Sequence, residues 1–265
     1  MALVPVNNED LKEYAVLHND IVDKYSFKDL TEREENILIV LLSKLQKQEA
    51  FSKVSLKEIK NMIDKSMTYK TLSEDILNLG NKRLFLIAEK EIKDNKGNII
   101  SKKNDLWRPV IFSTVIIHDD EKNVSVRFNP DIEYLFWQMK EEFEKVNPHH
   151  YLKIKSQNWK AFYRLCKRWE NYPNRVEITV DNLKRILMYD DNMEYKTLKR
   201  RLNAVIKKVN EITTLHVEFE EKKKGRKINS LIFSIKSLKE QIRESIPNNE
   251  LENKYLQMAK KFIKA

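Results

Sequence analysis

Five polar side chains recur at helical spacing between residues 196 and 207. On a helix, residues three or four apart share a face, so this spacing gathers four cations and one amide on one side, with no carboxylate among them. An Arg guanidinium offers two parallel donors that fit guanine O6 and N7, and an Asn amide fits the edge of adenine. Lysines, which lack that fork geometry, suit phosphates. The five residues are Lys196, Lys199, Arg200, Asn203 and Lys207.

Within this face, Arg200 and Asn203 are the predicted base contacts and the lysines the predicted phosphate contacts. Tyr195 begins the same helix, where it could reach a phosphate or a base, or serve as a capping core aromatic. A merely solvated helix face is the alternative for the whole set, although ordinary surface helices pair acids with bases at i and i+4.

A basic run lies between two predicted strands, 215–219 and 230–235, where a hairpin tip is expected. A tip of this kind would lie along a groove edge and neutralise phosphates, and a hairpin that only aids solubility is the alternative. Its members are Lys222, Lys223, Lys224, Gly225, Arg226 and Lys227.

Three helices precede this hairpin. The helix predicted over 195–211 turns Leu198, Leu202, Val205, Val209 and Ile212 toward a core. A helix over 157–169 and a short one opened by 180–183, with Asp181 as the expected N-cap, come before it. Three helices followed by a hairpin are typical of a winged helix, a helix-turn-helix with a β-wing.

An internal repeat places a second such unit upstream. Tyr69-Lys70-Thr71-Leu72 recurs as Tyr195-Lys196-Thr197-Leu198, and Leu56-Lys57-Glu58-Ile59 matches Leu183-Lys184-Arg185-Ile186. The first copy should contain a helix capped by Thr31 and Glu34, a helix capped by Ser55, and a helix from Tyr69 that ends near Gly80. Extended runs follow at 84–88, 110–117 and 124–128.

The sequence therefore predicts an α+β protein of two tandem winged-helix domains related by the repeat. We expect the first domain over 1–146, the second over 147–240, and an amphipathic helical tail over 241–265. Residues 1–150 hold 23 Lys and Arg against 26 Asp and Glu, whereas residues 151–236 hold 21 against 10. Because the positive charge is concentrated in the second domain, that domain is expected to bind a polyanion.

The first copy is a weaker candidate for the same task. Its third helix also carries Glu74 and Asp75, so a pairing or regulatory role is an equal alternative. The strand over 110–117 could be a core strand or an edge strand open to another subunit. Auxiliary DNA contacts in this copy are predicted at Thr68, Lys70, Ser73, Lys82 and Arg83.

Catalytic and cofactor chemistry finds little support. His149 and His150 are adjacent and point different ways, Cys166 is the only cysteine, and three glycines leave no phosphate loop or dinucleotide motif. We therefore expect no enzyme activity, no metal and no cofactor. No apolar stretch reaches membrane-spanning length and no signal peptide is evident, so a cytoplasmic protein without a membrane partner is expected.

Several stretches, in order, resemble the plasmid replication initiator Rep proteins that bind iterons, the RepB/RepE/Pi-like family. The likeness covers roughly residues 15 to 236. Its most specific parts are Val209-Asn-Glu-Ile212 and Lys224-Gly-Arg-Lys227. The others are His18-Asn-Asp-Ile-Val22, Leu30 to Leu38, Val126-Arg-Phe-Asn-Pro-Asp131, Glu194-Tyr-Lys-Thr-Leu198 and Leu231-Ile-Phe-Ser-Ile235.

The resemblance implies more than the residues do. It implies two winged-helix domains, the second binding repeated origin sites in double-stranded DNA and the first supporting dimerisation. Monomers would start replication, dimers would repress the protein's own promoter, and a host replication initiator and helicase would follow as partners. It assigns recognition to the basic face of 196–207 and wing contacts to Lys223, Lys224 and Arg226.

Other classes of protein would differ in their requirements. A tandem winged-helix transcriptional regulator would bind only an inverted site at a promoter. A plasmid nicking enzyme would need a catalytic tyrosine with metal-binding histidines, and the sequence has no His-x-His. A scaffold that binds acidic protein through the basic face would not show salt-sensitive, sequence-specific DNA binding.

Overall fold

The chain forms two compact units, Met1–Gln157 and Asn158–Ala265. The computed structural model describes residues 14–23, 25–27, 29–45, 52–93, 99–118, 122–136, 143–170 and 175–237. The sequence placed the boundary after residue 146, whereas helix α5 (Pro148–Lys153) belongs to the first unit, where the Tyr151 hydroxyl donates to Glu35. The predicted tail over 241–265 lies outside the described residues.

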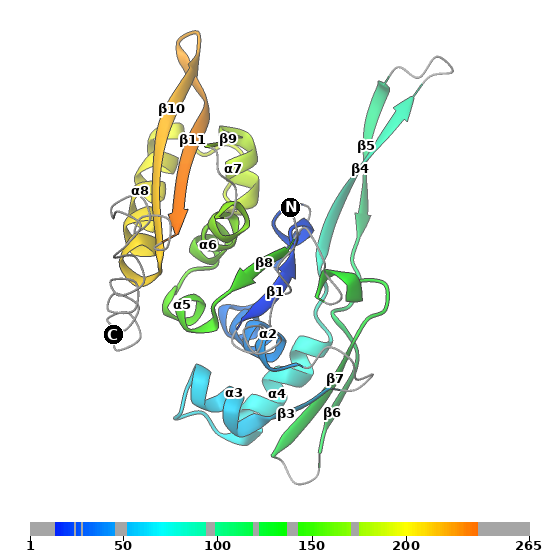
Figure 1. The fold of residues 1–265 in the computed structure, drawn as a ribbon. Helices are drawn as coiled ribbons and strands as arrows, with labels where there is room; N and C mark the ends of the chain where they lie inside the picture. Colours follow the sequence, from blue (N-terminus) through cyan, green and yellow to red (C-terminus); the bar gives the residue numbers. More distant parts are fainter. Residues whose placement is uncertain are drawn as a thin grey trace, which may run out of the picture. The chain divides into compact units, whose positions relative to one another are not determined.

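The described part of the second unit contains three helices and a three-stranded antiparallel sheet in the order β10-β11-β9 (Figure 1). The short strand β9 directly precedes α7, and the long hairpin β10–β11 extends past the ends of the helices. The elements are α6 (Gln157–Trp169), β9 (Val176–Thr179), α7 (Val180–Ile186), α8 (Tyr195–Ile212), β10 (Leu215–Lys224) and β11 (Lys227–Ser237).

The core of the second unit lies between its helices and one face of this sheet. Phe162 of α6 and Phe233 of β11 are buried with ring centroids 6.0 Å apart. Leu198 and Leu202 of α8 have no exposed surface. Burying a side chain of this size contributes roughly 1.5–3 kcal/mol, so the apolar side of α8 fixes which side of the helix remains for solvent.

The first unit repeats this plan. The order helix, strand, helix, helix, then two strands recurs, and its sheet has the order β3-β7-β6, which matches β9-β11-β10. The two predicted winged helices are therefore confirmed in topology. The matching elements are α2 (Glu32–Lys44), β3 (Ser52–Ser55), α3 (Leu56–Ile63), α4 (Tyr69–Gly80), β6 (Phe112–Ile117) and β7 (Asn123–Phe128).

The first unit also carries elements that have no counterpart in the described part of the second unit. A hairpin of β4 (Phe85–Lys93) and β5 (Ile99–Trp107) is inserted between α4 and β6, and it pairs with β2 (Tyr25–Ser26) in a separate sheet. The sequence predicted only the start of β4 and missed β5. The remaining elements are β1 (Ala15–His18), which pairs with β8 (Phe143–Val146), α1 (Asp20–Asp23) and the 3-10 helix η1 (Glu133–Leu135).

Helix caps follow the sequence in part. Thr31 and Glu34 form the expected capping box, each side chain bonded to the other's backbone N–H. Ser55 occupies the N-cap position of α3 but makes no side-chain cap bond. The cap of α7 is Thr179, which accepts from the backbone of Asn182. Asp181 is not the cap, because the helix begins two residues earlier than a cap at that position implies.

The sequence suggested that Gly80 directly follows α4 as a helix terminator. In the structure, Gly80 is the last residue of the helix itself. A β-carbon at Gly80 would lie 2.8 Å from Cγ2 of Val115 on β6. The glycine therefore allows a close approach of helix and strand. Strand β6 lies at an edge of its sheet, and Ile116 on it is 42% exposed. Whether another subunit pairs with this edge stays a prediction. In the described part of the chain, no helix combines the length and apolar character needed to cross a membrane.

Candidate nucleic-acid interface

Helix α8 exposes a straight row of polar side chains opposite its buried side. Leu198, Leu202, Val205 and Val209 are buried, whereas four exposed residues spaced four, three and four apart lie away from them. No described residue forms an ion pair with the three cations of this row, which we call the α8 row. The α8 row consists of Lys196, Arg200, Asn203 and Lys207.

The start of α8 is favourable for an anion near the α8 row. Glu194 takes the N-cap position but makes no side-chain cap bond, so the first turn keeps unpaired N–H groups. These groups and the helix dipole favour negative charge at this end. The free cation Lys196 lies in the same turn, while the side chain of Glu194 places one carboxylate at this end.

Lys199 lies beside the α8 row and is already paired. Its Nζ lies 2.6 Å from Oε1 of Glu221 on β10, and the same oxygen accepts from the Tyr195 hydroxyl at 2.7 Å. Glu221 therefore joins the first turn of α8 to β10, four residues before Gly225 at the hairpin tip. The sequence placed Lys199 and Tyr195 in the predicted DNA face, and the structure shows that both also make contacts within the protein.

This contact perturbs the titration of its members. The ion pair with Lys199, and then the hydrogen bond from Tyr195, hold the pKa of Glu221 below its usual value. Burial first, and the acceptance of its proton by Glu221 second, raise the pKa of Tyr195. Tyr195 is therefore a neutral donor near neutral pH.

The hairpin β10–β11 forms the wing. Its register shifts between Lys222 and Lys223, and Gly225 at the tip has a φ of +65°, a conformation that suits glycine. Lys222 is tied down by Glu177 of β9 at 2.7 Å, and no described residue pairs with the other cations of the tip. The unpaired wing cations are Lys223, Lys224, Arg226 and Lys227, all exposed.

Glu177 and Asn210 fix the base of the wing. Glu177 accepts from Lys222 and, at 2.6 Å, from the Ser230 hydroxyl, and these two bonds lower its pKa in that order. The Asn210 amide of α8 donates to Val217 O and accepts from Val217 N of β10, at 3.1 and 2.8 Å. The wing is thus attached to α8 at one side and to β9 at the other.

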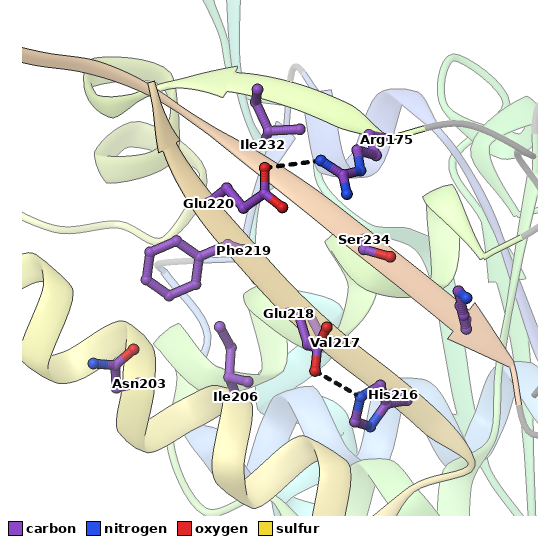
Figure 2. A pocket seen from close by; sticks show the side chains of 11 residues that line it. Arg175, Asn203, Ile206, His216, Val217, Glu218, Phe219, Glu220, Ile232 and Ser234 are labelled. Atoms are coloured by element: carbon purple, nitrogen blue, oxygen red, sulfur yellow. Dashed lines mark hydrogen bonds and ion pairs between the residues drawn. The ribbon is translucent and has the colours of Figure 1, made fainter. Parts of the chain in front are cut away.

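A hollow of about 810 Å³ lies along β10 and borders the α8 row. Figure 2 shows Asn203 and Ile206 coming from α8 and Phe219 from β10. Acid–base contacts at Arg175–Glu220, 2.8 Å, and His216–Glu218, 3.2 Å, also line it. The amide of Asn203 is therefore open on the hollow side, and no residue in the described part of the chain hydrogen-bonds to it.

Sequence reasoning missed three residues that organise this surface. Glu221 and Glu177 position the wing, and the guanidinium of Arg201 lies 5.1 Å from the ring centroid of Tyr189, in the turn before α8. Strand alternation was the available signal for Glu221. Side chains two residues apart on a strand point to the same face, so residue 221 faces α8 as Val217 and Phe219 do. Arg201 gave no signal, since it faces away from the α8 row.

The auxiliary candidates of the first unit are not brought together. Thr68 caps α4 by accepting from Thr71, and Lys70 and Ser73 lie in its first turns. Lys82 and Arg83 follow the other end of the helix, about 18 Å along it at 1.5 Å per residue. Lys82 pairs with Glu34 at 3.3 Å, and Arg83 donates to the carbonyl oxygen of Arg108.

In the residues that the structure describes, no three His, Cys, Asp or Glu side chains are grouped as metal ligands would be. His149 follows Asn147, whose side chain accepts from its backbone N–H and thereby caps α5. Cys166 is buried in α6.

Comparison with protein families identifies the class. A family described as the initiator replication protein, first winged-helix domain, matches residues 14–167, and its second winged-helix domain matches residues 179–235. Together the matches cover most of the chain. The protein belongs to the initiator Rep protein family and has its two winged-helix domains.

Two solved structures resemble the chain at sequence identities of 20% or less. The Pi initiator protein, crystallised in complex with iteron DNA, is 20% identical with a TM-score of 0.59, over 87% of this chain and 98% of that one. Domains 2 and 3 of RctB are 11% identical with a TM-score of 0.40, over 80% and 83%. No curated protein matches the chain.

Proposed function

We propose that this protein initiates plasmid replication by binding directly repeated origin sites, or iterons, in double-stranded DNA, and that it does so without catalysis. The observation that carries the proposal is the α8 row, in which three unpaired cations and one open amide lie beside the unpaired wing cations. Membership of the initiator family and the likeness in fold to an initiator crystallised with iteron DNA support it.

The division of roles follows from side-chain chemistry. Arg200 and Asn203 read base edges in the major groove, because both can form paired hydrogen bonds with a base. Lys196, Lys207 and the wing cations neutralise phosphates and set the position of the helix. Lys222 and Lys199, each held by a carboxylate, contribute less.

Self-association and later partners belong to the same proposal. The edge strand β6 of the first unit leaves backbone groups for pairing, and Ile116 is exposed on it. A dimer would bind an inverted site at the protein's own promoter and repress it. The first unit adds auxiliary contacts through Lys70 and its neighbours, and a host replication initiator and helicase act after the origin is bound.

The first test is a footprint of the purified chain on the DNA that flanks its own gene, at near-physiological salt with competitor DNA. Several evenly spaced protected repeats are expected. Protection of a single inverted repeat would instead indicate a transcriptional regulator with tandem winged helices. Absence of any protected site would contradict the proposal.

Lys224→Ala examines the phosphate role of the wing. The variant should weaken binding to the protected repeat and to a scrambled duplex by the same factor. It should also reduce the slope of log K against log salt by about 0.9, the value for one lost phosphate contact. A loss confined to the protected repeat would mean that Lys224 reads sequence.

A further inference from the structure

Glu221 of β10 brings a carboxylate to the first turn of α8, directly before the wing cations in the sequence. Glu221 is bonded to Lys199 at 2.6 Å and to Tyr195 at 2.7 Å, and Lys223 is close enough to lower its pKa. Helix α8 itself contains no carboxylate before Glu211. A negative charge at this place repels phosphates and occupies a lysine that could bind one, so it weakens attraction to DNA in general.

The first unit lacks this contact at the corresponding positions. The Tyr-Lys-Thr-Leu repeat aligns Tyr69 with Tyr195 and hence Ser73 with Lys199. Strand register aligns Ile117 with Glu221. In the second unit, Glu221 pairs with Leu231, which pairs with Ile178, the third residue of β9. In the first unit, Ile117 pairs with Val124, which pairs with Val54, the third residue of β3. The tyrosine is therefore present in both units, whereas the lysine and the carboxylate occur together in the basic unit alone.

We propose that Glu221 is a specificity-determining residue, which holds Lys199 at the base of the wing and thereby lowers the affinity of the protein for DNA of arbitrary sequence. The inference rests on the proposed function, since it concerns how the second unit distinguishes its site from other DNA. Glu221 acts through Lys199 and Tyr195 and so is a positioning residue.

The physical basis is that the two kinds of complex depend differently on phosphates. Non-specific binding consists almost entirely of phosphate contacts, so removing one lysine from use weakens it by nearly a full contact. Site-specific binding also gains from base contacts, which the α8 row makes without Lys199. The same bonds fix the wing relative to α8 before DNA arrives, which lowers the entropy cost of docking both on a matching site.

Glu221→Gln tests the inference, because glutamine keeps the size and the acceptor for Tyr195 but removes the charge. Two duplexes serve as probes: one that wild-type full-length protein selects from a random pool, and a scrambled copy. At about 0.1 M salt the scrambled duplex should bind roughly threefold to tenfold more tightly, with a salt slope steeper by about 0.9. The selected duplex should change less, so the ratio of the two affinities should fall.

Glu220→Gln is the matched control. Glu220 lies on the same strand but faces the other side, where it pairs with Arg175. The control removes the same charge from the unit, and it should leave the ratio of the two affinities unchanged.

Lys199→Gln separates the holding of a lysine from simple repulsion. In this background Glu221→Gln should have little further effect. By itself, Lys199→Gln should weaken binding to the scrambled duplex less than Lys196→Gln does, since Lys196 is unpaired. This last comparison stands even if Glu221→Gln does not fold.

Several results would overturn the inference. They are an equal gain on both duplexes, no gain on either, the same gain in the Lys199→Gln background, or equal losses for Lys199→Gln and Lys196→Gln. A wild-type protein that selects no sequence from the random pool would contradict the proposed function itself, which is a different outcome from an unchanged ratio in the variant.

Discussion

The third helices of the two units, α4 and α8, begin with the same four residues and then differ in surface. After Tyr-Lys-Thr-Leu, α8 continues with Lys199, Arg200 and Arg201, whereas α4 continues with Ser73, Glu74 and Asp75. Asp75 pairs with Arg33 of α2 at 3.3 Å, so this acid of α4 serves a contact within the first unit. The buried positions Leu72, Ile76 and Leu79 keep the apolar pattern of α8.

The two units also differ in how the third helix meets the neighbouring strand. The repeat aligns Gly80 with Ile206, and strand register aligns Val115 with Phe219. Gly80 lets α4 approach Val115 of β6 so closely that a β-carbon at residue 80 would not fit. Ile206 and Phe219 instead line the hollow along β10 (Figure 2). One plan thus carries a closed helix–strand contact in one unit and an open hollow in the other.

This difference teaches that the apolar pattern and the surface are set separately. The same buried leucines and isoleucines give both units the winged-helix topology, while the exposed positions are free to carry opposite charge. Topology alone therefore does not say which unit binds DNA. That question has to be answered from the side chains of the site. Variants at aligned positions can test the contrast directly.

Arg200 and Glu74 occupy aligned positions, and replacing Arg200 should give the largest effect. Arg200→Ala should weaken binding to the protected repeat by about 1–3 kcal/mol and relax the preference at one base pair, since it removes a two-donor contact. Binding titrations against single-base variants of the repeat measure both effects.

Glu74→Ala is the matched variant in the first unit. It should leave affinity for the repeat unchanged or slightly raised, because it removes a negative charge from a helix outside the main contact. Arg200→Ala with wild-type affinity would show that the recognition face is misplaced. A strong loss with Glu74→Ala would show that α4 and α8 share the task.

Gly80→Ala should break the closed contact of the first unit. The added methyl would meet Val115, whose branched side chain has little freedom, so we expect a loss of about 1–3 kcal/mol in the free energy of unfolding. Amide hydrogen exchange can assign the loss to α4 and β6.

The aligned Ile206→Val provides the comparison in the second unit. It should cost no more than about 0.5–1.5 kcal/mol, because a half-buried side chain beside an open hollow loses one methylene. Undiminished protection of α4 in Gly80→Ala would contradict the view that this glycine sets the helix–strand distance.

The sequence predicted the repeated plan because apolar periodicity carries it. Helix α6 was predicted with its observed bounds, and α8 within one residue, since Leu198, Leu202, Val205 and Val209 leave little choice of face. The α8 row and the wing cations followed from the same periodicity. Which of them bind DNA remains a prediction.

Other features depend on contacts that a linear pattern does not contain. Strand β5 is polar through its middle and gave no alternating signal. The cap at Thr179 rather than Asp181 depends on where β9 ends. Gly80 resembled a helix terminator, and only the position of Val115 shows its packing role. Glu221 and Glu177 act across strand and helix, so their partners lie far away in sequence.

Protonation of Glu177 should have the smallest effect of the changes considered. The aligned residue of the first unit is Lys53. Bonds from Lys222 and Ser230 lower the pKa of Glu177 from its usual 4.5. A carboxyl whose folded pKa is depressed stabilises the fold above its unfolded pKa, and this contribution is lost as pH falls through the folded value. The base of the wing should therefore loosen on acidification below about pH 4.5, whereas the β3–β7 pair has no carboxylate there to protonate.

Side-chain carboxyl NMR of the full chain can measure this titration. The midpoint of Glu177 should lie below 4.5 in the wild type and move upward in Lys222→Met, because Lys222 is the larger cause of the shift. Ser230→Ala should move it upward by less. A midpoint that stays in place in Lys222→Met would mean that the ion pair does not hold the wing in solution. The side-chain contacts that hold the wing would then be mainly those of Asn210 and Glu221 with α8, in addition to the backbone pairing of β11 with β9.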